Sequence, residues 1–121
     1  MALNIVQFPK QDGDASLDMV PGWAIIAGNP VMKTWNHYES ADGKTLAGVW
    51  EASEGTYSVN YVDWEFCHFL EGECILTKTG HAPVTLKAGD VFMIEPGFTG
   101  TWQVVKKVKK YYTFVLSGDT A

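Results

Sequence analysis

Cysteine is scarce in this sequence, and so is positive charge. Only two cysteines, Cys67 and Cys74, occur among 121 residues, and they do not form a Cys-x-x-Cys motif. Two are too few for a disulfide framework, so we expect buried free thiols in a reducing compartment. Nine basic residues face fourteen acidic ones, which gives a formal net charge of -5. This balance argues against a broad attraction to phosphate backbones, and we expect no nucleic-acid partner.

Long apolar runs are absent as well. No stretch approaches the roughly 18 residues of a membrane span. The N-terminal stretch MALNIVQFPKQDGD also lacks a basic segment followed by an apolar core. We therefore expect a cytoplasmic protein with no membrane partner. The remaining composition is that of a globular protein, because 46% of the residues are hydrophobic and 19% are charged, which indicates one folded domain.

The spacing of apolar runs and turn residues predicts an all-β fold. From residue 25 onward, short runs recur at intervals of roughly ten residues, which is typical of a barrel or jelly roll. A turn at Glu71-Gly72 is predicted to separate the strands EFCHFL and ECILTKT. Near the C-terminus, GTWQVV and KYYTFVL are predicted as two further strands. The basic cluster KKVKK, Lys106 to Lys110, is predicted to be a solvated turn or strand face.

The beginning of the chain has a different character. Residues 1–24 contain the breakers Pro9, Gly13 and Pro21 and show little sustained periodicity. We predict an N-terminal arm over 1–24, followed by a single β-barrel domain over 25–121. No internal repeat or linker divides the second part.

Two stretches resemble the paired motifs of the cupin superfamily. Glu65, six residues and Gly72 match the second half of the first motif, and GDVFMIEPGFTGTWQV follows the opening of the second. The histidine pair of the first motif would fall on Val59 and Tyr61, or on Ser58 and Asn60 in another register, and the last histidine would fall on Gly100. Of the motif's metal ligands only the carboxylate of Glu65 remains, and a single ligand is too few for a tight metal site.

Four segments resemble one subgroup in particular. GVWEASEGTYSVNY, EFCHFLEGE, GDVFMIEPGFTGTW and KKYYTF are similar to cupins grouped with (S)-ureidoglycine aminohydrolase and the EutQ domains of ethanolamine utilisation. The resemblance implies a single-domain, cupin-type (RmlC-like) jelly-roll β-barrel. It also implies a homodimer formed by strand exchange or sheet packing, for which the arm over 1–24 is the candidate exchanged piece. The manganese site of the aminohydrolase needs side chains that this sequence does not supply.

Strand alternation selects the candidate site residues. It places Tyr57, Tyr61, Glu65 and Cys67 on one face, and the resemblance implies that this face lines the barrel interior and that Trp102, two residues beyond the missing histidine, lies near it. A desolvated carboxylate there could act as an acid or base or bind an amine, so Glu65 is the candidate catalytic residue. Alternatively, Glu65 has a structural role and forms a hydrogen bond with a buried tyrosine or tryptophan side chain. His68 has the opposite parity and is predicted to face outward. The predicted ligand pocket consists of Tyr57, Tyr61, Glu65, Cys67 and Trp102.

Three functions remain open at this point. The first is binding of a small polar metabolite in the barrel, with no cofactor and no complete metal site. The second is an enzyme on a nitrogenous small substrate, similar to an aminohydrolase or isomerase, with Glu65 as acid or base. Such an enzyme needs a second polar group nearby, for which Tyr57, Tyr61, Asn60 and Glu51 are available. The third is a structural or regulatory subunit with a filled barrel. A divalent metal held by Glu65 and His68 in a different strand register is a further alternative.

Overall fold

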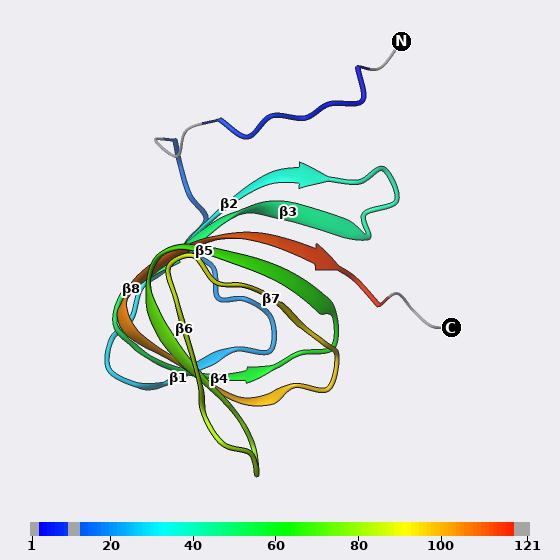
Figure 1. The fold of residues 1–121 in the computed structure, drawn as a ribbon. Coiled ribbons are helices and arrows are strands. Elements are labelled where there is room, and N and C mark those ends of the chain that lie inside the picture. Colours follow the sequence, from blue (N-terminus) through cyan, green and yellow to red (C-terminus); the bar gives the residue numbers. More distant parts are fainter. Residues whose placement is uncertain (1–2, 10–12, 118–121) are drawn as a thin grey trace.

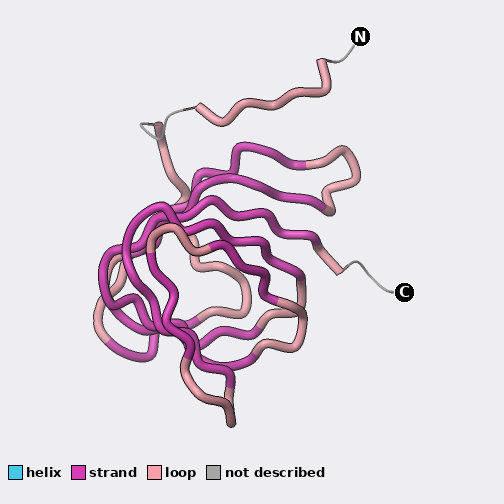
Figure 2. Tube along the Cα trace, in the orientation of Figure 1, coloured by secondary structure: helices cyan, strands magenta, loops and turns pink. Residues whose placement is uncertain are grey.

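A curled antiparallel sheet forms the body of the protein. The computed structural model describes residues 3–9 and 13–117, and the sheet within them has eight strands (Figures 1 and 2). Among these residues no helix is long and apolar enough to cross a membrane. The strands are β1 (Ala24–Ala27), β2 (Met32–Glu39), β3 (Thr45–Ala52), β4 (Gly55–Asn60), β5 (Trp64–Lys78), β6 (Val84–Lys87), β7 (Val91–Ile94) and β8 (Thr99–Val115).

The two long strands organise this sheet. β8 pairs with β4 through its first half, with β3 through its second half, and with β5 over most of its length. β5 also pairs with β6 and β7, so the sheet bends around an enclosed interior (Figure 1). The edges beyond β4 and β3 are formed by β1 and β2. The prediction of an all-β barrel is therefore confirmed.

The predicted turn at Glu71-Gly72 is wrong. β5 runs through this dipeptide without reversing, and its pairing with β8 shifts register there in a set of β-bulges. Gly72 adopts φ +91°, and a Cβ on it would lie 2.2 Å from the carbonyl oxygen of Lys107. Glycine is required here because the backbone of β8 crosses close by, and the bulge bends the strand while it stays paired.

The two strands predicted near the C-terminus are one. β8 continues through the basic cluster because β3, β4 and β5 provide hydrogen-bonding partners along its whole length. The expectation of a solvated cluster is met by Lys106 and Lys107, which are exposed. It is wrong for Lys110, which is 2% exposed. Strand alternation turns this lysine into the barrel together with Val108 and Tyr112.

Aromatic rings fill one end of the interior. The ring centroid of Trp23 lies 5.1 Å from that of Trp102 and 5.3 Å from that of Tyr57. Trp23 falls within the predicted arm, but it is buried and joins the core. Such tilted and edge-to-face contacts stabilise a core beyond the area they bury. Both cysteines, Cys67 and Cys74, are buried and unpaired, which confirms the expectation of free thiols.

Candidate polar centre and adjoining cavity

Glu65 is the centre of a buried polar cluster. It lies near the start of β5 with only 1% of its surface exposed. The hydroxyl of Tyr61 donates a hydrogen bond to its Oε1 at 2.5 Å, and the ammonium of Lys110 donates to its Oε2 at 2.7 Å. Both carboxylate oxygens therefore have a donor, which a buried charge requires.

Lys110 supplies the positive charge of this cluster. Its Nζ lies 4.3 Å from the ring centroid of Trp102, 4.7 Å from that of Trp50 and 3.6 Å from the Cys67 sulfur. Burial by itself would lower the pKa of this amine, but Cys67, at the high pH where its thiol ionises, and the Glu65 carboxylate outweigh that effect and raise it. The side chain is therefore an ammonium ion at neutral pH, held by one carboxylate and two indole faces.

Sequence reasoning missed Lys110. The local signal of four lysines in five residues favours a solvated segment. The alternation of β8 contained the information, because Val108 and Tyr112 lie two residues to either side of Lys110 and both face inward.

Tyr61 and Cys67 stay protonated in this environment. Burial raises the pKa of the Tyr61 hydroxyl well above its ordinary value, and the Glu65 carboxylate raises it further. Burial and the same carboxylate raise the pKa of the Cys67 thiol, although Lys110 acts in the opposite direction. A nucleophilic cysteine needs the thiolate form. Cys67 is therefore a buried neutral thiol.

All five residues of the predicted pocket lie in the interior, each at most 3% exposed. Tyr61 and Cys67 contact the Glu65–Lys110 pair directly, and Trp102 covers the ammonium. Tyr57 packs against Trp23 instead, and its hydroxyl has no hydrogen-bond partner among the described residues. Outside the barrel, His68 is half-buried beside Tyr111, with the two ring centroids 6.1 Å apart.

The polar centre does not fit a divalent metal ion. The described residues contain no group of three or more His, Cys, Asp or Glu side chains that could hold one. The nearest charged neighbour of Glu65 is an ammonium, which donates hydrogen bonds and cannot ligate a metal. At Gly100, where a cupin histidine would fall, a Cβ would lie 1.9 Å from the carbonyl oxygen of Thr77, so no side chain fits in this backbone arrangement.

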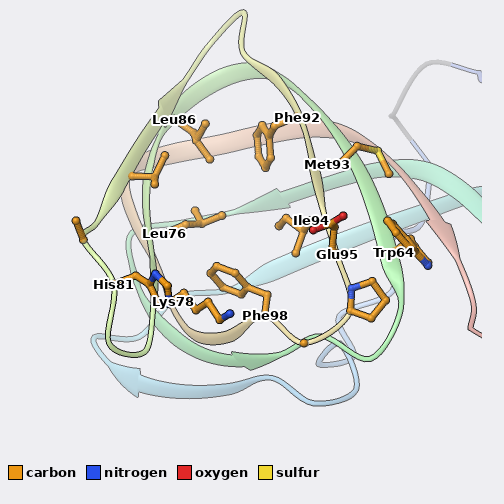
Figure 3. Close-up of a pocket in the computed structure, with 14 residues that line it drawn as sticks. Trp64, Leu76, Lys78, His81, Leu86, Phe92, Met93, Ile94, Glu95 and Phe98 are labelled. Carbon is orange, nitrogen blue, oxygen red and sulfur yellow. The ribbon is translucent and has the colours of Figure 1, made fainter.

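A cavity of about 810 Å³ lies beside this centre (Figure 3). Two of its lining residues also border the polar cluster. Ile94 is the register partner of Glu65 between β7 and β5, and the ring of Phe98 meets that of Tyr61 edge-on at 5.9 Å. Sequence reasoning did not find this cavity. It is lined by Trp64, Leu76, Lys78, His81, Ala82, Val84, Leu86, Phe92, Met93, Ile94, Glu95, Pro96, Gly97 and Phe98.

Comparison with known families agrees with this fold. Residues 39–112 match the model of the EutQ-like cupin domain. This match covers more than half of the chain, so the protein belongs to the EutQ-like cupin family. No curated protein matches the sequence.

Solved structures share the same barrel. The Clostridium difficile EutQ protein aligns with a TM-score of 0.63 and 16% identity over 74% of this chain and 71% of that chain. A putative ethanolamine utilization protein Q from Salmonella typhimurium aligns with a TM-score of 0.64 and 21% identity, over 73% of this chain and 72% of that chain. A DUF861 family protein of unknown function from Pseudomonas syringae aligns with a TM-score of 0.72 and 20% identity, over 91% of this chain but only 51% of that chain. At these identities the similarity shows the fold alone.

Proposed function

We propose that this protein binds a small organic molecule in the cavity beside the Glu65–Lys110 pair, and that it does so without a divalent metal. The cavity itself is the observation that carries the proposal. Its volume of about 810 Å³ lies within the range of small-molecule sites, which are mostly apolar with a few polar groups. Side chains such as Leu76, Leu86 and Phe92 supply the apolar wall (Figure 3).

In this proposal the buried pair lies behind the apolar wall of the site and does not touch the ligand. Lys110 already neutralises Glu65 at 2.7 Å, so no bound metal is needed to balance the carboxylate. Two residues that line the cavity adjoin the polar cluster, since Ile94 is the register partner of Glu65 and the ring of Phe98 meets that of Tyr61. The ligand therefore meets an apolar surface at its inner end.

The test uses a neutral fluorescent probe, N-phenyl-1-naphthylamine, whose emission rises in apolar surroundings. The wild-type protein should bind the probe, and small metabolites that enter the cavity should displace it. Leu86→Trp adds a large ring to the cavity wall and should abolish binding. Val105→Trp places the same ring on a partly exposed position of β8 that does not line the cavity, and it should leave binding unchanged. Equal binding by wild type and Leu86→Trp would contradict the proposal.

One observation favours a second function, an enzyme acting on a nitrogenous small substrate with Glu65 as acid or base. Catalysis of this kind needs a second polar group next to the carboxylate, and the Tyr61 hydroxyl lies 2.5 Å from it. The two functions separate in the Glu65→Gln variant. An enzyme loses turnover of its substrate in this variant, whereas a binding protein retains the affinity of the cavity for its ligand.

A further inference from the structure

The ionisable residues around the cavity are unevenly distributed. Lys78, at the end of β5, and His81, in the turn that follows, lie on one side, and Glu95 lies across the cavity from them (Figure 3). The turn holds the two basic residues together, because the His81 amide donates a hydrogen bond to the Lys78 carbonyl at 2.9 Å. Gly80, at φ +82°, supplies the conformation that the turn requires.

Lys78 and His81 have no carboxylate partner of their own. Within residues 3–9 and 13–117, the ion pairs are Lys107–Glu51 and Lys110–Glu65. The two basic groups at the cavity rim are therefore available to an anion from outside the chain. Next to them the wall is apolar and partly aromatic, with Leu76, Phe92 and Phe98.

We infer that the ligand of this cavity is an organic monocarboxylic acid with an apolar, preferably aromatic body. This inference rests on the proposed function. The carboxylate accepts charge-assisted hydrogen bonds from Lys78 and His81, which are stronger than those between neutral groups. The body lies against Leu76, Phe92 and Phe98 and gains the free energy of apolar burial. On the far side, Glu95 repels a second negative charge, so a dicarboxylate is disfavoured.

The test compares three molecules with the same ring system by isothermal titration calorimetry. They are 2-naphthoate, its neutral amide 2-naphthamide, and naphthalene-2,6-dicarboxylate. Wild-type protein should prefer the monocarboxylate. Lys78→Gln should weaken the binding of 2-naphthoate about tenfold, as expected for one lost charged hydrogen bond, and should leave 2-naphthamide unchanged. Glu95→Gln should tighten the binding of the dicarboxylate. Lys87→Gln, at an exposed position outside the cavity, is the matched control and should change nothing.

The outcomes distinguish the two proposals. If 2-naphthoate and 2-naphthamide bind equally well to the wild type and to Lys78→Gln, the preference for carboxylates is wrong and the binding function stands. If none of the three molecules binds and the neutral fluorescent probe also fails, both proposals are wrong. If the dicarboxylate binds best to the wild type, the assignment of a monoanion is overturned.

Discussion

Lys110 is the counter-ion of the buried Glu65 carboxylate. Removing an ammonium ion from water costs several kcal/mol, and a buried ion pair recovers this only with good geometry. Here the 2.7 Å contact with Glu65 is supplemented by the faces of Trp50 and Trp102. Each such cation–π contact adds about 0.5–2 kcal/mol. The ammonium thus provides, from within the chain, the positive charge that the carboxylate requires.

Removing the ammonium alone should therefore be costly. Lys110→Met leaves Glu65 buried without its counter-ion, and we expect the free energy of unfolding to fall by about 3–5 kcal/mol. Lys106→Met, at an exposed position of the same cluster, should change it by less than about 0.5 kcal/mol. Urea denaturation followed by circular dichroism measures both.

The double variant provides the control for this explanation. Lys110→Met combined with Glu65→Leu removes both charges, and most of the lost stability should return because neither ion is left unpaired. If the double variant is as unstable as Lys110→Met alone, the loss comes from packing and the ion-pair account is wrong.

The pH dependence of stability follows from the same cluster. The pKa values of Cys67, Tyr61 and Lys110 are all raised in the folded protein. The unfolded chain therefore releases these protons first as the pH rises, beginning near the ordinary cysteine value of 9.0. The stabilisation is complete below that pH and is lost above it.

Denaturation curves between pH 7 and 11 test this expectation. The free energy of unfolding should be nearly constant up to about pH 9 as far as these groups are concerned, and should then fall. Above pH 9 the free energy of unfolding should fall less steeply in Lys110→Met/Glu65→Leu. This variant lacks the titrating amine and also the carboxylate that raises the pKa values of Tyr61 and Cys67. A stability that rises above pH 9 in the wild type would reverse the predicted sign.

At the scale of elements, β5 shows what a local pattern can and cannot predict. Alternation correctly predicts that Glu65 and Cys67 face inward, because burial repeats every second residue in a regular strand. Beyond the bulges the buried positions change from odd to even numbers, at Cys74 and Leu76. The pair Glu71-Gly72 has the composition of a turn, but a glycine with positive φ serves equally in a bulge. Whether this pair forms a turn or a bulge depends on β8, which pairs with β5 although it is distant in sequence. No local signal contains that information.

The bulge can be tested against a matched glycine. Gly72→Ala brings a Cβ to within 2.2 Å of the Lys107 carbonyl, whereas Gly80, also at positive φ, has nothing within 4 Å. Gly80→Ala should therefore cost only backbone strain, about 1–2 kcal/mol. Gly72→Ala should cost about 3 kcal/mol or more, because strain and overpacking add. Thermal unfolding compares the two, and equal costs would show that the close approach of β8 does not matter.

For the whole molecule, the sequence predicts the barrel better than it predicts the site. Regular spacing of runs and turns is enough for an all-β fold, since each strand carries its own alternation. The interior position of Glu65 follows in the same way. The position of the cavity cannot be derived from alternation, because the cavity is formed where the turn around His81, the strands β6 and β7 and the segment near Phe98 meet. Several parts of the chain contribute, including β5, and none has a pattern of its own.

Exposed apolar side chains occur on the outer surface of β5 and β7. Trp64 and Phe66 on β5 and Met93 on β7 are 40%, 38% and 52% exposed, and Phe66 and Met93 are register partners. Trp64 and Met93 also line the cavity, so this surface borders its rim. In the arm, Leu3 and Ile5 are 76% and 67% exposed. Adjacent apolar side chains of this kind mark interaction surfaces. We expect a second copy of the chain to cover them in a homodimer.

Sedimentation equilibrium tests this expectation. The wild type should have about twice the chain mass of 13.4 kDa. Phe66→Lys should shift the protein to the monomer, because a charge on the covered face is costly to desolvate. Val105→Lys, a partly exposed position on β8, is the control and should remain dimeric. A monomeric wild type at tens of micromolar would contradict the proposal.

We propose that this cupin needs no metal ion to bind a ligand in the cavity, because the Lys110 ammonium already balances the buried Glu65 carboxylate. The most direct measurement is calorimetric titration of 2-naphthoate into protein dialysed against a chelator, repeated after addition of one equivalent of manganese or zinc. The dissociation constant should be the same in both titrations, in the wild type and in the exposed control Lys106→Met. Binding that occurs only after a metal is added would show that a metal is required.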